Sequence, residues 1–207
     1  DALSPEYREE ALQRLRSTSE PGGQLDVLIV GGGVVGAGAA LDAVTRGLKV
    51  GMVEARDWAS GTSSRSSKLI HGGLRYLEML DFALVQEALK ERGLLLQRIA
   101  PHLVKPVPFL YPLTKRFIER PYVGAGIFLY DTLGMTSGNS RGVPMQKHLT
   151  RRGTLRAAPS LKDDAMIGSI RYYDGQVDDA RYVANMVRTA VHYGATAVNR
   201  LSVVDFL

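Results

Sequence analysis

The chain has 207 residues, of which 45% are hydrophobic and 23% are charged, a balance typical of a folded globular protein rather than a disordered one. Lys and Arg number 26 against 21 Asp and Glu, and the net charge of +5 favours anionic partners without requiring nucleic acid. The sequence lacks cysteine, which excludes disulfides, thiolate zinc sites and cysteine nucleophiles, and its four scattered histidines give little support to a metal centre. No apolar run approaches the ~20 residues of a membrane-spanning helix, so we expect a cytoplasm-facing protein whose attachment to a membrane surface stays open.

The amino-terminal part begins with a helix and continues as an alternating strand, helix and strand. Ser4 suits the cap of the first helix, because its side-chain oxygen can accept a hydrogen bond from a backbone amide at the start of the helix that has no other partner. Pro5 suits the first turn, because proline has no backbone amide hydrogen to leave without a partner there. After a linker, DVLIV is an apolar run of strand length, the next stretch is rich in small residues like a closely packed helix, and LKVGMVE is a second strand. These elements are residues 4–16, 26–30, 34–46 and 48–54.

Two later segments have the apolar spacing of amphipathic helices. The first is residues 81–100, and the second is residues 179–192, for which Asp178 or Asp179 is the expected cap. The apolar positions are Phe82, Val85, Leu89, Leu96 and Ile99 in the first segment and Val183, Met186, Val187, Ala190 and Val191 in the second.

Other segments are expected to be extended or to contact a surface. Three prolines restrict residues 103–113 to an edge strand or an extended segment, and residues 196–207 alternate like a strand, from which we expect the natural chain to continue. Residues 115–135 join a basic flank to an apolar stretch with aromatic residues. Such a segment could lie in a membrane interface, but a buried helix with a solvated flank is favoured because Gly124 and Gly126 indicate close packing.

A glycine fingerprint lies between the first predicted strand and the helix after it. Gly31, Gly33 and Gly36 of GGGVVG match the GxGxxG pattern, in which the glycines allow a tight turn, close approach of the backbone to a pyrophosphate, and close packing of helix on strand. Glu54, 23 residues after Gly31, would accept hydrogen bonds from ribose hydroxyls and oppose a 2′-phosphate, although the nearby Arg56 keeps NADP open. The pattern predicts a dinucleotide site without saying which dinucleotide, and the alternative is a glycine-rich turn beside a surface glutamate.

A second candidate site is the basic stretch SSRSSKLIHGGLRYL, residues 63–77. Arg65, Lys68, His71 and Arg75 lie there without any acidic residue, so their charges would repel one another unless an anion or solvent compensated them. The stretch therefore predicts an anion site, with a solvated basic loop as the alternative.

The side chains of three residues in this stretch suggest specific roles. Arg75 and the hydroxyl of Tyr76 could hold a phosphate, because a guanidinium presents several donors in a fixed geometry. His71 could exchange a proton near neutral pH. The residues alone do not identify the ligand that carries the phosphate.

These motifs together resemble one enzyme family from Asp26 onward. The run DVLIVGGGVVGAGAALDAVTRGLKVGMVEARDWASGTSSRSSKLIHGGLRYLE, followed by RGLLLQRIAPHLVKPVPFLYPL and YYDGQVDDAR, resembles the FAD-dependent glycerol-3-phosphate dehydrogenases of the aerobic, quinone-linked type. Their oxidase relatives share SSKLIHGGLRYLE. The resemblance implies an α/β fold: a Rossmann-like FAD-binding domain with a mainly parallel sheet, truncated before the substrate or cap portion and the carboxyl-terminal portion.

The resemblance also implies a domain division. Residues 1–25 would form an amino-terminal helix and linker, and residues 26–207 an incomplete FAD-binding domain in which residues 100–150 are a substrate-side insertion. Because later parts of the family pattern have no counterpart here, we expect this chain alone to be inactive.

The site residues implied by the resemblance fall on the two motifs. Arg75 and Tyr76 would contact the phosphate of glycerol 3-phosphate, and His71 would be the base that takes the C2 hydroxyl proton. In this family hydride passes from C2 to flavin N5, which yields dihydroxyacetone phosphate, and the electrons go on to a membrane quinone. The cofactor FAD would be held by Gly31, Gly32, Gly33, Gly36, Glu54, Ser66, Ser67, Lys68, Leu69, His71, Gly72 and Gly73, and no metal is implied.

The partners expected from these observations are glycerol 3-phosphate, a quinone, and the cytoplasmic face of a membrane through peripheral contact. A homodimer is left open. The basic cluster at residues 151–156 is expected to be a solvated face, and no nucleic-acid-binding motif accompanies it.

Three other functions share part of the pattern. A glycerol-3-phosphate oxidase would pass the electrons to oxygen instead of a quinone. A non-catalytic flavin- or nucleotide-binding module would keep Gly31 to Glu54 but have no use for Arg75. A soluble NAD-dependent dehydrogenase would be colourless and bind NAD strongly.

Overall fold

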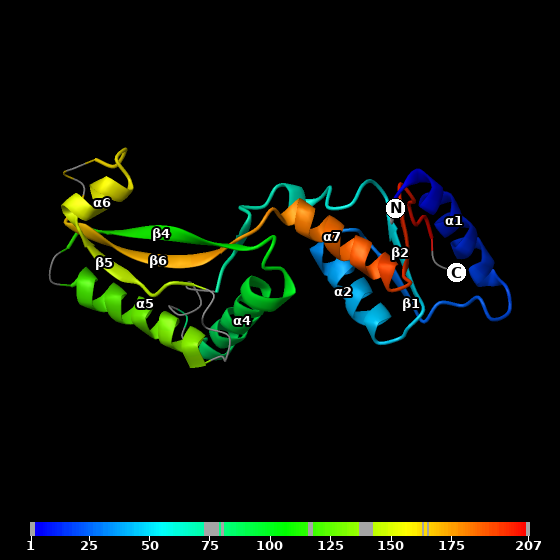
Figure 1. The fold of residues 1–207 in the computed structure, drawn as a ribbon, viewed down its shortest axis with the longest axis horizontal. Helices are drawn as coiled ribbons and strands as arrows, with labels where there is room; N and C mark the ends of the chain where they lie inside the picture. Colours follow the sequence, from blue (N-terminus) through cyan, green and yellow to red (C-terminus); the bar gives the residue numbers. More distant parts are fainter. Residues whose placement is uncertain are drawn as a thin grey trace. The chain divides into compact units, whose positions relative to one another are not determined.

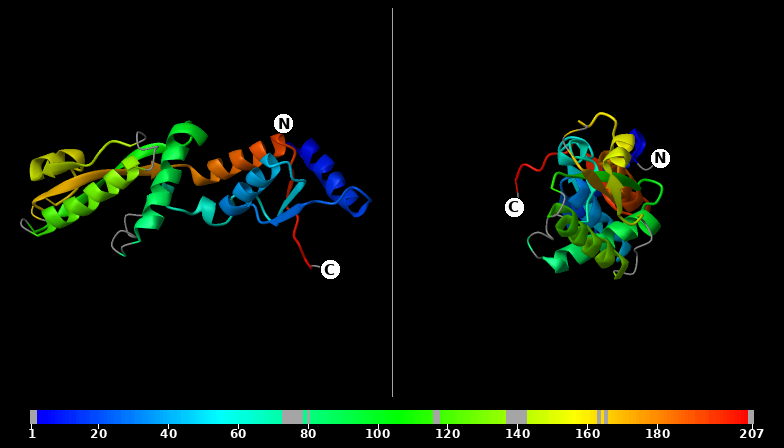
Figure 2. Two further views of the ribbon diagram at one scale, coloured as in Figure 1. Left: turned by 90° about the horizontal axis from the view of Figure 1, so that it is seen from below. Right: turned by 90° about the vertical axis from the view of Figure 1, so that its left-hand side faces the viewer.

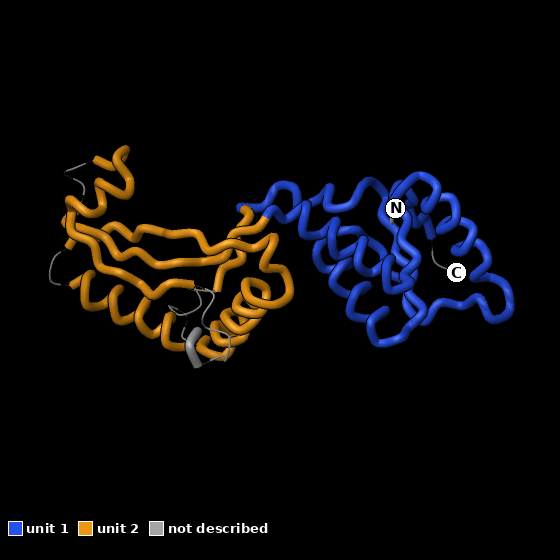
Figure 3. Tube along the Cα trace, in the orientation of Figure 1, with its two compact units in different colours: residues 1–67, 178–207 blue, residues 68–177 orange. Residues whose placement is uncertain are grey.

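The computed structural model describes residues 3–72, 79, 81–115, 118–136, 143–162, 164 and 166–205. The chain divides into two compact units, shown in different colours in Figure 3. Unit 1 takes residues 1–67 and 178–207, and unit 2 takes residues 68–177.

Unit 1 is built on a parallel sheet of three strands in the order β1-β2-β7. Val27 of β1 pairs with Val50 of β2, and Gly51 of β2 pairs with Thr196 of β7. The strand, helix and strand predicted after the linker are confirmed, as is the parallel sheet. The elements of unit 1 are α1 (Pro5–Arg16), the short 3-10 helix η1 (Ser17–Ser19), β1 (Val27–Val30), α2 (Val34–Thr45), β2 (Val50–Glu54), the 3-10 helix η2 (Thr62–Ser64), α7 (Asp179–His192) and β7 (Thr196–Asn199).

Helices cover both faces of this sheet (Figures 1 and 2). On one face α2 and α7 pack against each other and against the strands, and small residues of α2 allow the close approach. The cap predicted for α7 is confirmed, since the Asp178 side chain accepts from the amide of Arg181. The buried residues on this face are Ala37, Ala40, Val44, Val50, Met52, Ala59, Val183, Val187, Ala190, Ala195 and Ala197.

The opposite side carries α1, which begins as predicted with Ser4 as cap and Pro5 in the first turn. Its side chains bond the backbone of β7, a terminal strand of the described sheet. The Tyr7 hydroxyl donates to the carbonyl of Ala195 at 3.3 Å and accepts from the amide of Ala197 at 3.0 Å. Helix α1 thus supplies partners that a neighbouring strand would otherwise provide.

Strand β7 is shorter than the sequence suggested. The alternation of residues 196–207 predicted a strand throughout, but β7 ends at Asn199 and residues 200–205 lie outside any strand. Arg200 has a φ of +54°, so the backbone leaves the extended conformation there.

Unit 2 contains an antiparallel sheet that the sequence did not predict. Its centre is β6, which pairs along its whole length with β4 and at its two ends with β3 and β5. The three prolines of β4, Pro106, Pro108 and Pro112, are separated by even numbers of residues, so their missing amides all fall on the side away from β6, as expected for an edge strand. The strands are β3 (Leu69–Ile70), β4 (Lys105–Leu113), β5 (Lys147–Thr150) and β6 (Gly168–Gln176).

The helices of unit 2 pack on this sheet and on each other, and α5 runs along one face of it (Figures 1 and 2). The helix predicted over residues 81–100 is present, but its last turn is π-helical, and Phe82 and Ile99 of the predicted face are exposed. The helices are α4 (Phe82–Leu94), the π-helix η3 (Leu95–Ile99), α5 (Glu119–Thr136) and α6 (Arg151–Ala157).

The helix predicted in residues 115–135 is present as α5, with one buried and one exposed side. Ile127 and Tyr130 are buried, whereas Tyr122 and Phe128 are exposed by 76% and 53%. Within the described residues, no helix combines the length and the hydropathy needed to cross a membrane.

Candidate functional site

The glycine fingerprint forms the turn that joins β1 to α2. Gly31 has a φ of +120°, which an L side chain rarely adopts, and its amide donates to the carbonyl of Val53 at 2.8 Å. A Cβ on Gly36 would lie 2.1 Å from the carbonyl oxygen of Gly31, so only glycine lets α2 approach the end of β1 this closely. These two positions have the roles that the sequence assigned to them.

The amino terminus of α2 is open. Gly33 is the N-cap, no side chain caps the helix, and a Cβ at Gly33 would have no neighbour within 4 Å. Val35, in the first turn, is 82% exposed. The first amides of a helix have no partner within the helix and carry the positive end of its dipole, so this open end suits a pyrophosphate.

Glu54 ends β2 and faces the glycine turn. One carboxylate oxygen, Oε2, accepts from the amide of Gly32 at 2.7 Å, and the other, Oε1, accepts from the amide of Arg56 at 2.7 Å. Two backbone donors therefore hold the carboxylate, and each oxygen retains a lone pair for a ligand hydroxyl.

Gly32 lies under the segment that follows β2. A Cβ there would meet Trp58 at 2.6 Å and Glu54 at 2.9 Å, and its carbonyl accepts from the amide of Ala59 at 2.9 Å. Both backbone groups of Gly32 are thus engaged inside the loop. Trp58 and Ala59 were not predicted from the sequence, although an indole shortly after the fingerprint glutamate is a signal that the sequence shows.

The serine-rich and basic stretch is divided between the units. Ser66 and Ser67 belong to unit 1 and are exposed, whereas Lys68 begins unit 2. Lys68 has a φ of +59°, and its carbonyl accepts from the amide of Val177 at 2.9 Å.

The next residues are attached to β6. Leu69 pairs with Gln176 as the first residue of β3, His71 is exposed, and Gly72 is buried. Three predicted site residues, Gly73, Arg75 and Tyr76, lie outside the described residues.

Sequence reasoning also missed a buried polar cluster in unit 2. Arg92, Tyr130 and Asp174 are exposed by only 4%, 0% and 5%. Arg92 follows Val85 and Leu89 on the same face of α4, and a charge on an apolar face was the signal that could have identified it.

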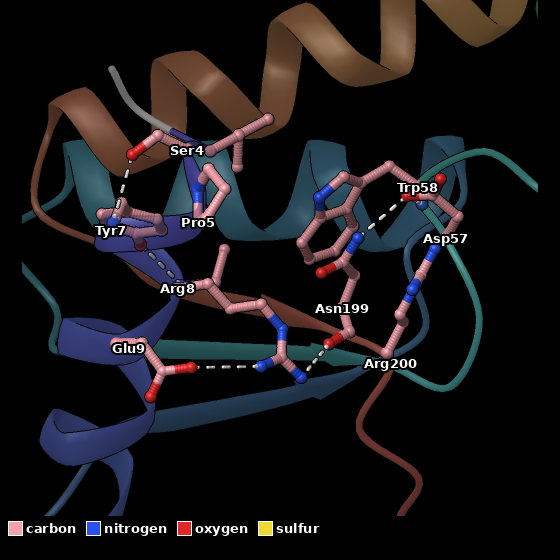
Figure 4. Close-up of a pocket in the computed structure, with 11 residues that line it drawn as sticks. Ser4, Pro5, Tyr7, Arg8, Glu9, Asp57, Trp58, Asn199 and Arg200 are labelled. Atoms are coloured by element: carbon pink, nitrogen blue, oxygen red, sulfur yellow. Dashed lines mark hydrogen bonds and ion pairs between the residues drawn. The ribbon is translucent and has the colours of Figure 1, made fainter.

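A separate cavity of about 590 Å³ lies in unit 1 between α1 and the carboxyl ends of β2 and β7 (Figure 4). Asn199 donates from Nδ2 to Oδ1 of Asp57 at 2.9 Å, and Arg8 donates from Nη2 to the carbonyl of Asn199 at 3.2 Å. Its lining includes Trp58 but neither the fingerprint glycines nor Glu54, so it is distinct from the open end of α2. In the part of the chain that the structure describes, no group of three or more His, Asp or Glu side chains could hold a metal ion.

Comparison with known proteins agrees with this geometry. Residues 26–207 match the family described as FAD dependent oxidoreductase. The chain is 60% identical over 206 residues to a glycerol-3-phosphate dehydrogenase of Mycobacterium leprae, with coverage of 100% of this chain and 34% of the relative. It is 45% identical over 210 residues to the human mitochondrial glycerol-3-phosphate dehydrogenase, with coverage of 98% and 28%. The chain thus spans about a third of the length of these relatives.

Solved structures give the same result. The FAD complex of a glycerol-3-phosphate dehydrogenase from Bacillus halodurans superposes with a TM-score of 0.64 at 31% identity, covering 97% of this chain and 31% of that one. A glycerophosphate oxidase from Mycoplasma pneumoniae with FAD bound has a TM-score of 0.62 at 18% identity, covering 85% and 44%, which supports the fold alone. The resemblance found in the sequence and the predicted fold class are confirmed.

Proposed function

The chain belongs to the FAD-dependent oxidoreductase family, and on that premise we propose that the protein containing it oxidises sn-glycerol 3-phosphate to dihydroxyacetone phosphate. The observation that carries the proposal is the 60% identity to a glycerol-3-phosphate dehydrogenase across the whole chain. The family identifies the cofactor as FAD, which confirms the prediction from the sequence. Bound FAD supplies the hydride acceptor for this oxidation.

The residues of unit 1 fit the ADP half of FAD. The open end of α2 at Gly33 offers backbone amides to the two phosphates, and the lack of neighbours beside Gly33 leaves room for them. Glu54 is held by the amides of Gly32 and Arg56 and can still accept from ribose hydroxyls. A bulkier residue at Gly31, Gly33 or Gly36 would strain the turn, enter the cradle or displace α2.

The serine-rich and basic stretch has the remaining roles in the proposal. Ser66, Ser67 and Lys68 lie along the cofactor, Leu69 to Gly73 run beside the flavin, and Arg75 with Tyr76 binds the substrate phosphate. A cation at that phosphate turns binding of a non-reacting group into orientation of C2. His71 removes the C2 hydroxyl proton, a role that its exposed imidazole allows.

The electron acceptor in the proposal is a quinone, reached by peripheral contact with the cytoplasmic face of a membrane. The exposed aromatic side chains of α5, Tyr122 and Phe128, support such a contact, because aromatic residues favour membrane interfaces. A homodimer is compatible with this arrangement.

The proposal extends to the organisation of the chain. Residues 26–207 form an incomplete FAD-binding domain, with residues 1–25 as an amino-terminal helix and linker. Residues 100–150 belong to the substrate side. We expect the chain by itself not to turn over substrate, an expectation supported by its coverage of only 34% of its relative from Mycobacterium leprae.

The test is the visible absorption spectrum of the longest natural polypeptide that contains this sequence, before and after anaerobic addition of glycerol 3-phosphate. Bleaching of an oxidised flavin supports cofactor and substrate together. A flavin that stays oxidised contradicts the substrate, and a colourless protein that binds NAD contradicts the cofactor. Oxygen consumption without added quinone would replace the dehydrogenase by the oxidase.

A substitution separates the enzyme from a non-catalytic binding module. Arg75→Ala should lower kcat/KM for glycerol 3-phosphate by about 10- to 100-fold, the range expected for loss of a charge-assisted hydrogen bond. Arg65→Ala removes the same charge from the same stretch and serves as the matched control. Equal activity of both variants would show that Arg75 does not bind the substrate.

A further inference from the structure

Unit 2 contains a buried polar cluster made of Arg92 on α4, Tyr130 on α5 and Asp174 on β6. Figure 1 shows α4, α5 and β6, the elements that contribute these side chains. A guanidinium and a carboxylate in an apolar core cost free energy of desolvation, and apolar residues of similar volume often serve stability as well or better. We therefore expect the buried Arg92–Asp174 pair to have a role other than stabilising the fold.

One carboxylate oxygen collects the donors of the cluster. Asp174 Oδ1 accepts from Nη1 of Arg92, from the Tyr130 hydroxyl at 2.8 Å and from the amide of Gly72 at 3.1 Å. Arg92 Nη1 also donates to the Tyr130 hydroxyl at 3.0 Å and to the carbonyl of Tyr173 at 3.3 Å. Burial raises the pKa of the Tyr130 phenol, so the hydroxyl keeps the proton that it donates to Asp174.

The segment that receives this contact lies against the cluster without free space. A Cβ on Gly72 would lie 2.2 Å from the Tyr130 hydroxyl oxygen and 2.4 Å from Cδ2 of Leu89. Two residues earlier, Ile70 pairs with Gly175 of β6. The backbone on both sides of His71 is therefore held, by the β3–β6 pairing before it and by the Asp174 carboxylate after it.

We propose that Arg92, Tyr130 and Asp174 are positioning residues that hold the backbone of residues 69–72, and with it His71, in the conformation used for catalysis. The inference rests on the proposed function, in which this segment runs beside the flavin. Arg92 and Tyr130 orient the carboxylate, and the carboxylate sets the position of the Gly72 amide. None of the three needs to touch substrate or cofactor, because each acts through Gly72.

The test replaces the buried pair by apolar residues in the full-length natural protein. The double variant Arg92→Met with Asp174→Leu keeps the core filled but removes the bond to Gly72. We expect it to stay folded and to bind FAD, with kcat per bound flavin reduced about 10- to 100-fold and with a changed flavin absorption band, because small displacements at a reacting centre have effects of this size. Unchanged kcat and an unchanged flavin spectrum would overturn the proposal.

A second variant keeps the test decisive if the double variant does not fold. Tyr130→Phe retains the ring and loses only the bridging hydroxyl, and it should lower kcat per bound flavin more than it lowers the melting temperature. Tyr172→Phe, on the same strand as Asp174, is the matched control, since Tyr172 stacks on Phe109 with ring centroids 5.4 Å apart. Equal kcat and flavin spectra for Tyr130→Phe and Tyr172→Phe would also overturn it.

The experiments distinguish failure of the positioning role from failure of the proposed function. If the wild-type protein binds FAD but is not reduced by glycerol 3-phosphate, the proposed function is wrong. The flavin absorption band and the FAD dissociation constant of the variants then still report on the positioning of residues 69–72. If the wild-type protein is reduced and the variants match it in every readout, only the positioning role is wrong.

Discussion

Substitution of Gly36 by alanine tests the close approach of α2 to β1. The added Cβ would lie 2.1 Å from the carbonyl oxygen of Gly31, whereas real Cβ atoms essentially never come within 3.0 Å of such an atom, so α2 and the Gly31 turn must separate by at least 3.0 − 2.1 = 0.9 Å. Gly38 lies in the same helix, and a Cβ there meets nothing within 4 Å. Gly38→Ala is therefore the matched control, with the same change of residue and no clash.

The expected magnitudes follow from two opposing effects. Replacing glycine by alanine inside a helix stabilises it by about 1 kcal/mol, and Gly38→Ala should show this gain. Overpacking costs about 1–3 kcal/mol, so Gly36→Ala should be less stable than Gly38→Ala by about that amount. The displaced end of α2 should also weaken FAD binding about 10-fold, which corresponds to ~1.4 kcal/mol.

The assay is urea unfolding of both variants without FAD, followed by titration with FAD. A midpoint for Gly36→Ala equal to that of Gly38→Ala, together with unchanged FAD affinity, would refute the reasoning. It would mean that the turn relaxes without cost and that the third glycine of the fingerprint is not required for packing.

Three further predictions concern other parts of the structure. Gly33→Ala should leave the free energy of unfolding within about 0.5 kcal/mol of the wild type, because the added Cβ meets no protein atom. The same variant should bind FAD more weakly in a titration followed by flavin fluorescence, since the methyl group enters the space proposed for the phosphates. Tyr7→Phe should lower the free energy of urea unfolding by about 1–2 kcal/mol, because the carbonyl of Ala195 and the amide of Ala197 lose their partner. An unchanged unfolding midpoint would show that these two hydrogen bonds do not stabilise the fold. Burial raises the pKa of Tyr130 above its ordinary value near 10, so the folded state keeps the phenolic proton to a higher pH than the unfolded state does. The contribution of this group to the free energy of unfolding is therefore complete below pH 10 and is lost as the pH rises above it. Urea unfolding between pH 8 and 11 should show this decline, and Tyr130→Phe should show less of it.

Much of unit 1 was predictable from the sequence because its signals are local. The cap at Ser4, the apolar run of β1, the glycines before α2 and the glutamate that ends β2 each act within a few residues or across one strand–helix–strand unit. Such signals depend on backbone conformation and periodicity, which do not require knowledge of distant contacts. The dinucleotide fingerprint was predicted for this reason, whereas the choice of FAD came from the family resemblance.

The antiparallel sheet of unit 2 was not predictable in the same way. Strand β6 was not recognised, and β4 was predicted only as an edge strand or extended segment, because prolines restrict a strand without naming its partner. The strand expected beyond Asn199 shows the opposite error. Alternation of apolar residues indicates that a segment can be a strand, but pairing with β2 decides where β7 ends.

The sequence by itself determined the strand–helix–strand unit, its glycine turn and the basic stretch after it, since each is encoded by neighbouring residues. Only the tertiary structure brought Arg92 to Asp174, 82 positions apart, and Tyr7 to Ala197, 190 positions apart. Polar side chains of this kind give no periodic signal, and their partners are defined by how helices and strands pack. The contact of Asp174 with Gly72 therefore became visible only once β6 lay beside the segment that carries His71.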